Sequence, residues 1–168
     1  MFYLILSVLL TIGYGKVAAQ NHALGQTNPG ITYVNGQGMP QSNAETLSWY
    51  RKAAEKGHAA EQAYLGYLYQ HGKGVPQSDA EAVAWYRKAA EQGHAAGQRS
   101  LGWMYAKGRG ISQDAVKAYM WESLALLNGE AKAGTLLDEI AKQLTASQIS
   151  QAQALAQTCR AANYQTCE

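Results

Sequence analysis

The sequence has little of what catalysis or charge-driven binding requires. Only 15% of its 168 residues are charged, and the formal net charge is +2 at pH 7. A chain so close to neutral lacks the basic surface that nucleic-acid binding needs, so we expect no nucleic-acid partner. No Gly-x-Ser-x-Gly, Ser-x-x-Lys, His-Glu-x-x-His or Gly-x-x-x-x-Gly-Lys-Ser/Thr segment occurs. The sequence therefore predicts a protein that is not an enzyme and that carries no cofactor or metal.

Long apolar runs are missing except at the N-terminus. The run Phe2–Ile12 is too short to span a bilayer comfortably. The small residues Val17-Ala18-Ala19 come after it, and signal peptidase accepts such residues before a cleavage point at Gln20. We interpret residues 1–19 as a signal peptide, with an uncleaved membrane anchor as the alternative. The mature chain is then expected to be periplasmic or secreted, with no stable membrane span.

Cysteine is scarce, and both copies lie at the C-terminal end, at Cys159 and Cys167. An exported chain with an even number of cysteines is expected to pair them. The loop that they would close is short, so the chain-entropy gain is about 2–3 kcal/mol at most. We expect this disulfide to pin a C-terminal tail. No histidine or carboxylate pattern accompanies the two thiols, which argues against a metal site.

The most prominent feature that the sequence does contain is a repeat. Tryptophan recurs every 36 residues, at Trp49, Trp85 and Trp121. The ten residues that begin at Trp49 recur almost unchanged in the ten that begin at Trp85. A fixed period of this length is typical of solenoid proteins, in which each unit buries its apolar face only against its neighbours. Such a fold favours binding over chemistry.

Each repeat is predicted to form two helices joined by a glycine-rich turn. Residues 59–71 have apolar residues near helical spacing, and Gly72 after them can adopt the left-handed conformation that ends a helix. The turn Gly-x-Gly-Val-Pro prevents the helix from continuing. Ser78 with Glu81 three residues later predicts the start of a second helix, which runs to about Gln92.

The phrases Leu-Gly-x-x-Tyr, Gly-x-Gly-Val and Ala-x-x-Trp-x-x-x-Ala-Ala-x-x-Gly resemble the Sel1-like repeat, a relative of the tetratricopeptide repeat. The resemblance covers residues 33–129, with a partial unit at 33–59 and fuller units at 60–95 and 96–129. It implies an all-α fold, a short right-handed α-solenoid. The earlier residues 20–32 are polar, and we predict a flexible lead-in there.

Residues 130–168 are predicted to form a C-terminal helical cap that hides the open end of the solenoid. Thr145 with Gln148 is a capping-box pattern before a helix from about Ala146 to Asn163. The third repeat carries Met120-Trp121-Glu122-Ser123-Leu124 where the second has Ala84-Trp85-Tyr86-Arg87-Lys88. These apolar residues predict that the second helix of the last repeat is covered by the cap.

Aromatic residues supply the candidate binding site. Tyr69, Tyr105, Trp85 and Trp121 define the repeat and are predicted to pack in the core. By analogy with tetratricopeptide repeats, first helices line the concave face, and variable positions there form a stripe. Aromatic side chains give large contact areas at low entropic cost. The predicted partner-binding residues are Tyr64, Tyr67, His71, Trp103 and Lys107, with packing between repeats as the alternative role.

The remaining ionisable residues do not form a reactive group. His58 and His94 hold the same place in consecutive repeats, just after a helix-ending glycine, which favours a structural role. Carboxylates are scattered, so no pair suggests acid–base catalysis. The function predicted is a monomeric interaction module for an unknown protein or peptide. Two alternatives stay open: a hydrolase of the β-lactamase-like kind, associated with cysteine-rich Sel1-repeat proteins, and a structural or inhibitory subunit of an envelope complex.

Overall fold

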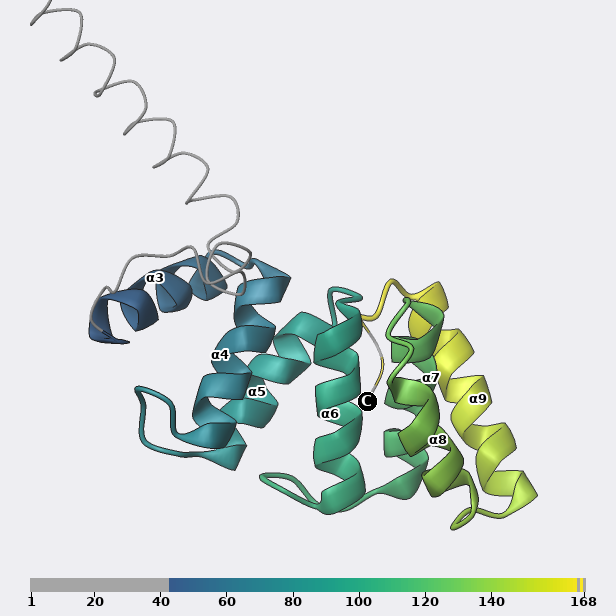
Figure 1. Ribbon diagram of the computed structural model, residues 1–168. Helices are drawn as coiled ribbons and strands as arrows, with labels where there is room; N and C mark the ends of the chain where they lie inside the picture. Colours follow the sequence, from purple (N-terminus) through teal and green to yellow (C-terminus); the bar gives the residue numbers. More distant parts are fainter. Residues whose placement is uncertain (1–42, 166, 168) are drawn as a thin grey trace, which may run out of the picture. The chain divides into compact units, whose positions relative to one another are not determined.

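The computed structural model describes residues 43–165 and Cys167, and these residues are helical with no strand among them (Figure 1). All of them belong to one compact unit, residues 42–168. The seven helices of this described part are α3 (Asn43–Glu55), α4 (Ala59–His71), α5 (Asp79–Ala90), α6 (Ala95–Lys107), α7 (Ala115–Leu127), α8 (Ala133–Ala141) and α9 (Ala146–Ala161).

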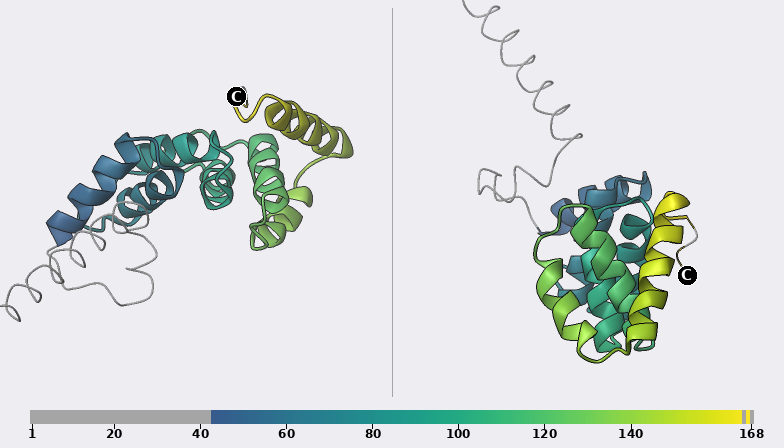
Figure 2. Two further views of the ribbon diagram at one scale, coloured as in Figure 1. Left: turned by 90° about the horizontal axis from the view of Figure 1, so that it is seen from above. Right: turned by 90° about the vertical axis from the view of Figure 1, so that its right-hand side faces the viewer.

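The helices pack as a solenoid. The pair α4 and α5 and the pair α6 and α7 are each the two helices of one repeat, and α5 packs against α6 to join the pairs. Figure 2 shows the helices from α3 to α7 succeeding one another in a row. The prediction of an all-α helical solenoid is therefore confirmed.

Turn residues set the helix ends. Gly72 and Gly108 come directly after α4 and α6 with φ 63° each, the left-handed conformation that a side chain disfavours. The Ser78 hydroxyl then accepts a hydrogen bond of 3.2 Å from the Glu81 amide and starts α5. Helix α4 has the predicted bounds, whereas α5 ends at Ala90, two residues earlier than predicted.

Two buried glutamines join successive repeats. Gln62 on α4 donates from Nε2 to the Ala54 carbonyl oxygen at 3.0 Å, and Gln98 on α6 donates to the Ala90 carbonyl oxygen at 3.2 Å. Both acceptors belong to the last turn of a second helix, where carbonyl groups lack helical partners. The same bond therefore fixes each first helix on the end of the preceding repeat.

The repeat aromatics are buried to different extents. Tyr105 and Trp121 are buried as predicted, and Trp121 is fully inaccessible. Tyr69 and Trp85 pack against the core as predicted, but both are only half-buried. Trp49 is 43% exposed. Trp121 is better covered than Trp85 because α9 packs against α7, whereas no helix of the described part packs to that extent on the equivalent face of α5.

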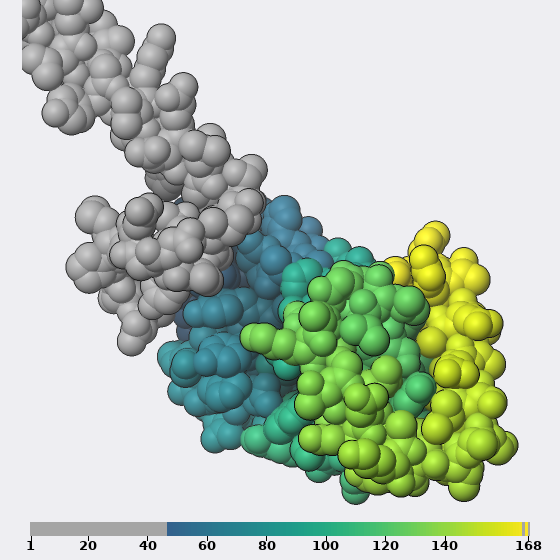
Figure 3. Space-filling view, turned by 45° about the vertical axis from the view of Figure 1, so that its right-hand side comes forward, coloured from purple at the N-terminus to yellow at the C-terminus, as the bar shows by residue number. Residues whose placement is uncertain are grey.

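The predicted cover of the third repeat is confirmed. Met120 and Leu124 on α7 are fully buried, and α9 contributes Ala152, Ala156 and Cys159 to the same core. Helix α9 starts at the predicted capping box, in which Thr145 and Gln148 bond each other's backbone amides. Figure 3 shows residues of α7, α8 and α9 as neighbouring bands at the surface of this end.

The C-terminal tail is fastened twice. Cys159 and Cys167 form the predicted disulfide. Between them, the hydroxyl of Tyr164 lies 3.1 Å from both Nδ2 and Oδ1 of Asn128, and Gln165 donates to the Glu91 carbonyl oxygen at 3.1 Å. The tail thus reaches from the cap back to the second repeat.

The predicted signal peptide 1–19, the lead-in 20–32 and the start of the first repeat lie outside the described residues. Within residues 43–165, no helix combines the length and the apolar character needed to cross a membrane.

Candidate partner-binding face

We call Tyr64, Tyr67, His71, Trp103 and Lys107 the first-helix face. The first three lie on α4, and the last two lie on α6, which packs beside α4. Tyr64, Tyr67 and Trp103 are half-buried, while His71 and Lys107, each the last residue of its helix, are exposed. These exposures leave part of every member accessible to a partner.

The α4 residues are in contact with one another. The rings of Tyr64 and Tyr67 stack with centroids 6.0 Å apart, and those of Tyr67 and His71 are 4.2 Å apart. Tyr50 of α3 extends the series, with its ring 4.3 Å from that of Tyr64. His71, with the proton on Nδ1, donates to the Tyr67 carbonyl oxygen at 2.9 Å. The structure thus brings this half of the face together as a continuous aromatic surface.

Two aromatic residues of the face, Tyr67 and Trp103, are each in contact with a basic side chain from the turn after their helix. Lys73 Nζ lies 4.8 Å from the Tyr67 ring centroid and donates to the Tyr67 hydroxyl at 2.6 Å. The Arg109 guanidinium lies 5.5 Å from the Trp103 centroid. Such cation–π contacts orient both partners and place positive charge beside the ring. Both cations come six residues after their aromatic partner, so the pair recurs with the repeat.

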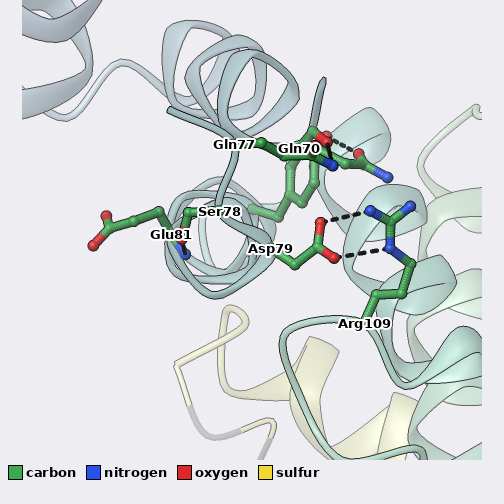
Figure 4. Close-up of polar contacts among 7 residues, drawn as sticks. Gln70, Gln77, Ser78, Asp79, Glu81 and Arg109 are labelled. Carbon is green, nitrogen blue, oxygen red and sulfur yellow. Dashed lines mark hydrogen bonds and ion pairs between the residues drawn. The ribbon is translucent and has the colours of Figure 1, made fainter. Parts of the chain in front are cut away.

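Arg109 is held by a second contact, to the preceding repeat. Its Nε and Nη2 donate to the two carboxylate oxygens of Asp79 at 2.9 Å each (Figure 4). This two-bond geometry fixes the guanidinium plane. Gly110 beside it has φ 68°, and a Cβ atom there would collide with the Asp79 backbone carbonyl. The turn of the third repeat therefore sits directly on the start of α5.

The position of the face depends on buried polar groups behind it. The Tyr86 hydroxyl donates to Gln70 Oε1 at 2.6 Å, and burial raises the pKa of Tyr86 to about 12. This tyrosine therefore stays neutral and holds the last turn of α4. His94 accepts a hydrogen bond of 3.2 Å from the Gly97 amide and starts α6, and burial lowers its pKa. The structural role predicted for His94 agrees with this cap.

Sequence reasoning missed Lys73, Arg109 and Asp79. The available signal was the repeat itself, because Lys73 and Arg109 are basic residues 36 positions apart in equivalent turns. Locally, both are ordinary turn residues, and Asp79 is an ordinary acidic residue at a helix start. The partner of Asp79 lies 30 residues away and could not be found from local spacing.

In the part of the chain that the structure describes, no three His, Cys, Asp or Glu side chains cluster in a way that could hold a metal ion. The chemistry available at the first-helix face is that of recognition: aromatic surface, two exposed helix ends and fixed cations.

The Sel1 repeat family model matches the chain at residues 21–58, 62–94 and 95–129. These matches cover more than half of the chain, so the protein belongs to the Sel1 repeat family. The first match begins inside the segment predicted as a lead-in. Among curated proteins, none matches the chain.

Solved structures give the same family. The chain is 40% identical to c5321, a protective antigen present in uropathogenic Escherichia coli strains, with a TM-score of 0.71 over 86% of this chain. It is 35% identical to a Sel1 repeat protein from Oxalobacter formigenes, with a TM-score of 0.62 over 71% of this chain. It spans only 31% and 49% of those two chains.

A third structure, cysteine-rich protein B of Helicobacter pylori, shares the fold. Its TM-score is 0.61 at 24% identity, with 73% of this chain and 93% of that chain covered. The likeness at this level concerns the fold alone. The repeats of the present chain contain no cysteine, because its two cysteines both lie in the cap.

Proposed function

We propose that the protein is an interaction module that binds a segment of another protein or a peptide through its first-helix face. Proteins built from Sel1 repeats are generally protein-interaction modules. The observation that carries the proposal is the recurring aromatic–cation pair, Tyr67 with Lys73 and Trp103 with Arg109, at equivalent places on successive first helices. Repeated side chains at a fixed spacing suit an extended partner, which presents its own side chains at regular intervals.

The binding energy would come mainly from the aromatic rings. Half-buried Tyr and Trp side chains are already ordered by their neighbours, so a partner that covers them loses little additional side-chain entropy. The cations beside them would select partners that offer carbonyl or carboxylate oxygens at the ring edges. The mechanism is therefore surface complementarity, and the proposal includes no chemical step.

We further propose that the protein acts as a monomer in the periplasm or outside the cell. The disulfide between Cys159 and Cys167 supports this location, because such bonds persist in oxidising compartments. Hydrolysis of β-lactams is the less favoured alternative, since the sequence contains neither a Gly-x-Ser-x-Gly nor a Ser-x-x-Lys nucleophile motif. A chromogenic β-lactam assay on purified protein tests it directly.

The test compares two aromatic pairs with the same spacing, one on the first helices and one on the second helices of the repeats. The first variant, Tyr67→Ala with Trp103→Ala, removes the rings of the first-helix face. The control, Trp49→Ala with Trp85→Ala, removes two rings with the same spacing from the second helices. A random peptide display library is panned against the wild type, and enriched peptides are titrated against all three proteins by fluorescence anisotropy.

We expect the wild type and the control to bind the enriched peptides alike. The face variant should bind at least tenfold more weakly, because removing an aromatic anchor costs about 2 kcal/mol or more. Circular dichroism confirms that each variant keeps its helical content. Equal binding by the face variant and the control would show that the partner uses another surface.

A further inference from the structure

Glu122 on α7 carries a carboxyl group that is buried in the described part of the structure. Its side chain is fully inaccessible, and neither carboxyl oxygen has a hydrogen-bond partner. It packs against Gly102 of α6, where an added Cβ atom would lie 3.0 Å from both Cγ and Oε1 of Glu122. A buried carboxylate without a partner is costly, so a carboxyl group in this place favours its neutral form.

The preceding repeat has a tyrosine at the same position. Tyr86 packs against Gly66 as Glu122 packs against Gly102, and the Tyr86 hydroxyl finds an acceptor in Gln70. At this position the second repeat thus has a neutral hydroxyl group with a hydrogen bond, and the third repeat has an ionisable carboxyl group without one. The replacement occurs in the last repeat, where α8 of the cap packs against α7 and touches α6.

Few charges act on this carboxyl group. From α6, Arg99 favours its ionised form, and from the turn after α7, Glu130 opposes it. Arg99 Nε lies 3.8 Å from Glu130 Oε1, and this Nε has no hydrogen bond. The other charged side chains on the helices around α7 are solvent-exposed; they are Lys107 on α6, Asp138 and Glu139 on α8, Lys142 after α8, and Arg160 on α9.

We propose that Glu122 is a proton-controlled latch between the last repeat and the cap: the protonated carboxyl group keeps α8 packed on α6 and α7, and ionisation loosens α8. Arg99 is the group that responds. Its loose contact with Glu130 leaves Nε available, so an ionised Glu122 draws the guanidinium inward. That movement breaks the Arg99–Glu130 contact, which joins α6 to the start of the cap.

The direction of the pH effect depends on the folded and unfolded states. Burial raises the pKa of Glu122 from 4.5 to about 8. The unfolded chain therefore releases this proton near pH 4.5, while the folded chain keeps it until about pH 8. The stabilising contribution is fully present below pH 4.5 and is lost as the pH rises through 8. Acidification tightens the latch.

The latch and the candidate partner-binding face share helix α6. Helix α8 touches α6, which carries Trp103 and Lys107. Loosening α8 would therefore remove a neighbour of the helix that carries this part of the face. The latch itself does not depend on the proposed function, because it concerns only the packing of the cap.

The first test measures the proton directly. Protein labelled with ¹³C at the glutamate side-chain carboxyl is titrated from pH 4 to 9.5 and monitored by NMR, with Glu122→Gln to assign the signal. We expect one glutamate signal, which is absent from Glu122→Gln, to titrate near pH 8. The absence of any glutamate signal that titrates near pH 8 in the wild type would overturn the proposal, and this outcome does not require the variant to fold.

The second test monitors α8. Trypsin cleavage after Lys132 and Lys142, which flank α8, is compared with cleavage after exposed Lys56 in the same sample, so that the pH dependence of trypsin cancels. Between pH 6 and 9 the ratio should rise by up to about a hundredfold in the wild type, because an exposed carboxyl group is ionised throughout this range and the buried one keeps its proton until about pH 8. It should stay constant in Glu122→Gln and rise as in the wild type in the control, Glu139→Gln. A rise that persists in Glu122→Gln would assign the loosening to another group.

Discussion

Helices α5 and α7 occupy equivalent places in consecutive repeats, but α5 leaves in solvent the side that α7 buries. On α5, Ala84 and Lys88 are exposed, and Lys88 Nζ lies 4.1 Å from the Trp85 ring centroid. On α7, the equivalent Met120 and Leu124 are fully buried beneath α9. The backbone arrangement is the same in both repeats, because the same turn residues and inter-repeat glutamines build it. A few side chains on one face decide whether a repeat is internal or terminal.

The largest effect should result from exchanging these side chains. Leu124→Lys gives α7 the residue of α5 and places a charge under α9. We expect a loss of about 4 kcal/mol in the free energy of unfolding, or detachment of α9, because a buried cation there has no partner. Urea unfolding monitored by circular dichroism measures the loss.

The reverse exchange is the matched control. Lys88→Leu on α5 places an apolar side chain in solvent, and we expect a change within about 0.5 kcal/mol. If both exchanges cost the same, the burial of α7 by α9 would not be what distinguishes the terminal repeat.

We expect an intermediate loss of stability for one of two equivalent glycines, Gly66 and Gly102, at which the first helix packs closely on the second helix of its repeat. A Cβ atom at Gly66 would lie 2.7 Å from the buried ring of Tyr86, whereas one at Gly102 would meet the flexible chain of Glu122 at 3.0 Å. Gly66→Ala should therefore cost about 2–3 kcal/mol through overpacking. Gly102→Ala should be close to neutral, because the gain in helix propensity of about 1 kcal/mol offsets a smaller clash.

Thermal unfolding of the two glycine variants measures this difference. Gly66→Ala should unfold several degrees below the wild type, and Gly102→Ala should unfold near it. Equal losses would indicate that Glu122 is as rigidly held as Tyr86, which would also weaken the case for a movable latch.

The smallest effect should come from the two equivalent histidines. His94 caps α6 through its ring, whereas His58 makes no side-chain cap at the start of α4. His94→Ala should cost about 1 kcal/mol and His58→Ala a few tenths at most. Chemical unfolding at pH 7.5 compares them.

The His94 contribution should also depend on pH. Burial lowers its pKa from the usual 6.5, so its stabilisation is present above pH 6.5 and is lost as the pH falls through the lowered value. Protonation of Nδ1 removes the acceptor for the Gly97 amide. The cost of His94→Ala should therefore shrink at low pH, and a cost that is independent of pH would contradict the capping role.

Most of the fold could be predicted because it depends on local signals that recur. Gly72 and Gly108 end first helices, and the capping residues at Ser78 and Thr145 start the next ones. The cover over α7 was also predictable, from Leu124 in place of Lys88. The half-buried state of Trp85 was not, because it depends on which face of α5 lacks a packed neighbour, and a period alone does not specify that.

The candidate site was less predictable. Equivalent positions on first helices pointed to Tyr67 and Trp103, and their partner-binding role stays a prediction. The turn cations that lie over these rings were missed, since a turn residue gives no local sign of where its side chain folds. Glu122 was missed for a related reason: its burial depends on the helices that pack around α7, and an isolated glutamate in a helix is normally solvent-exposed.

The fastened tail has a mechanical consequence. A solenoid pulled from one end usually opens one unit at a time, because each unit contacts only its neighbours. Here the Cys159–Cys167 bond closes the tail into a loop, and Tyr164 and Gln165 within it bind Asn128 after α7 and Glu91 of the second repeat. A force applied at the C-terminus is therefore shared by the cap and the second repeat at once. The cap and the second repeat would then have to yield together, rather than one after the other.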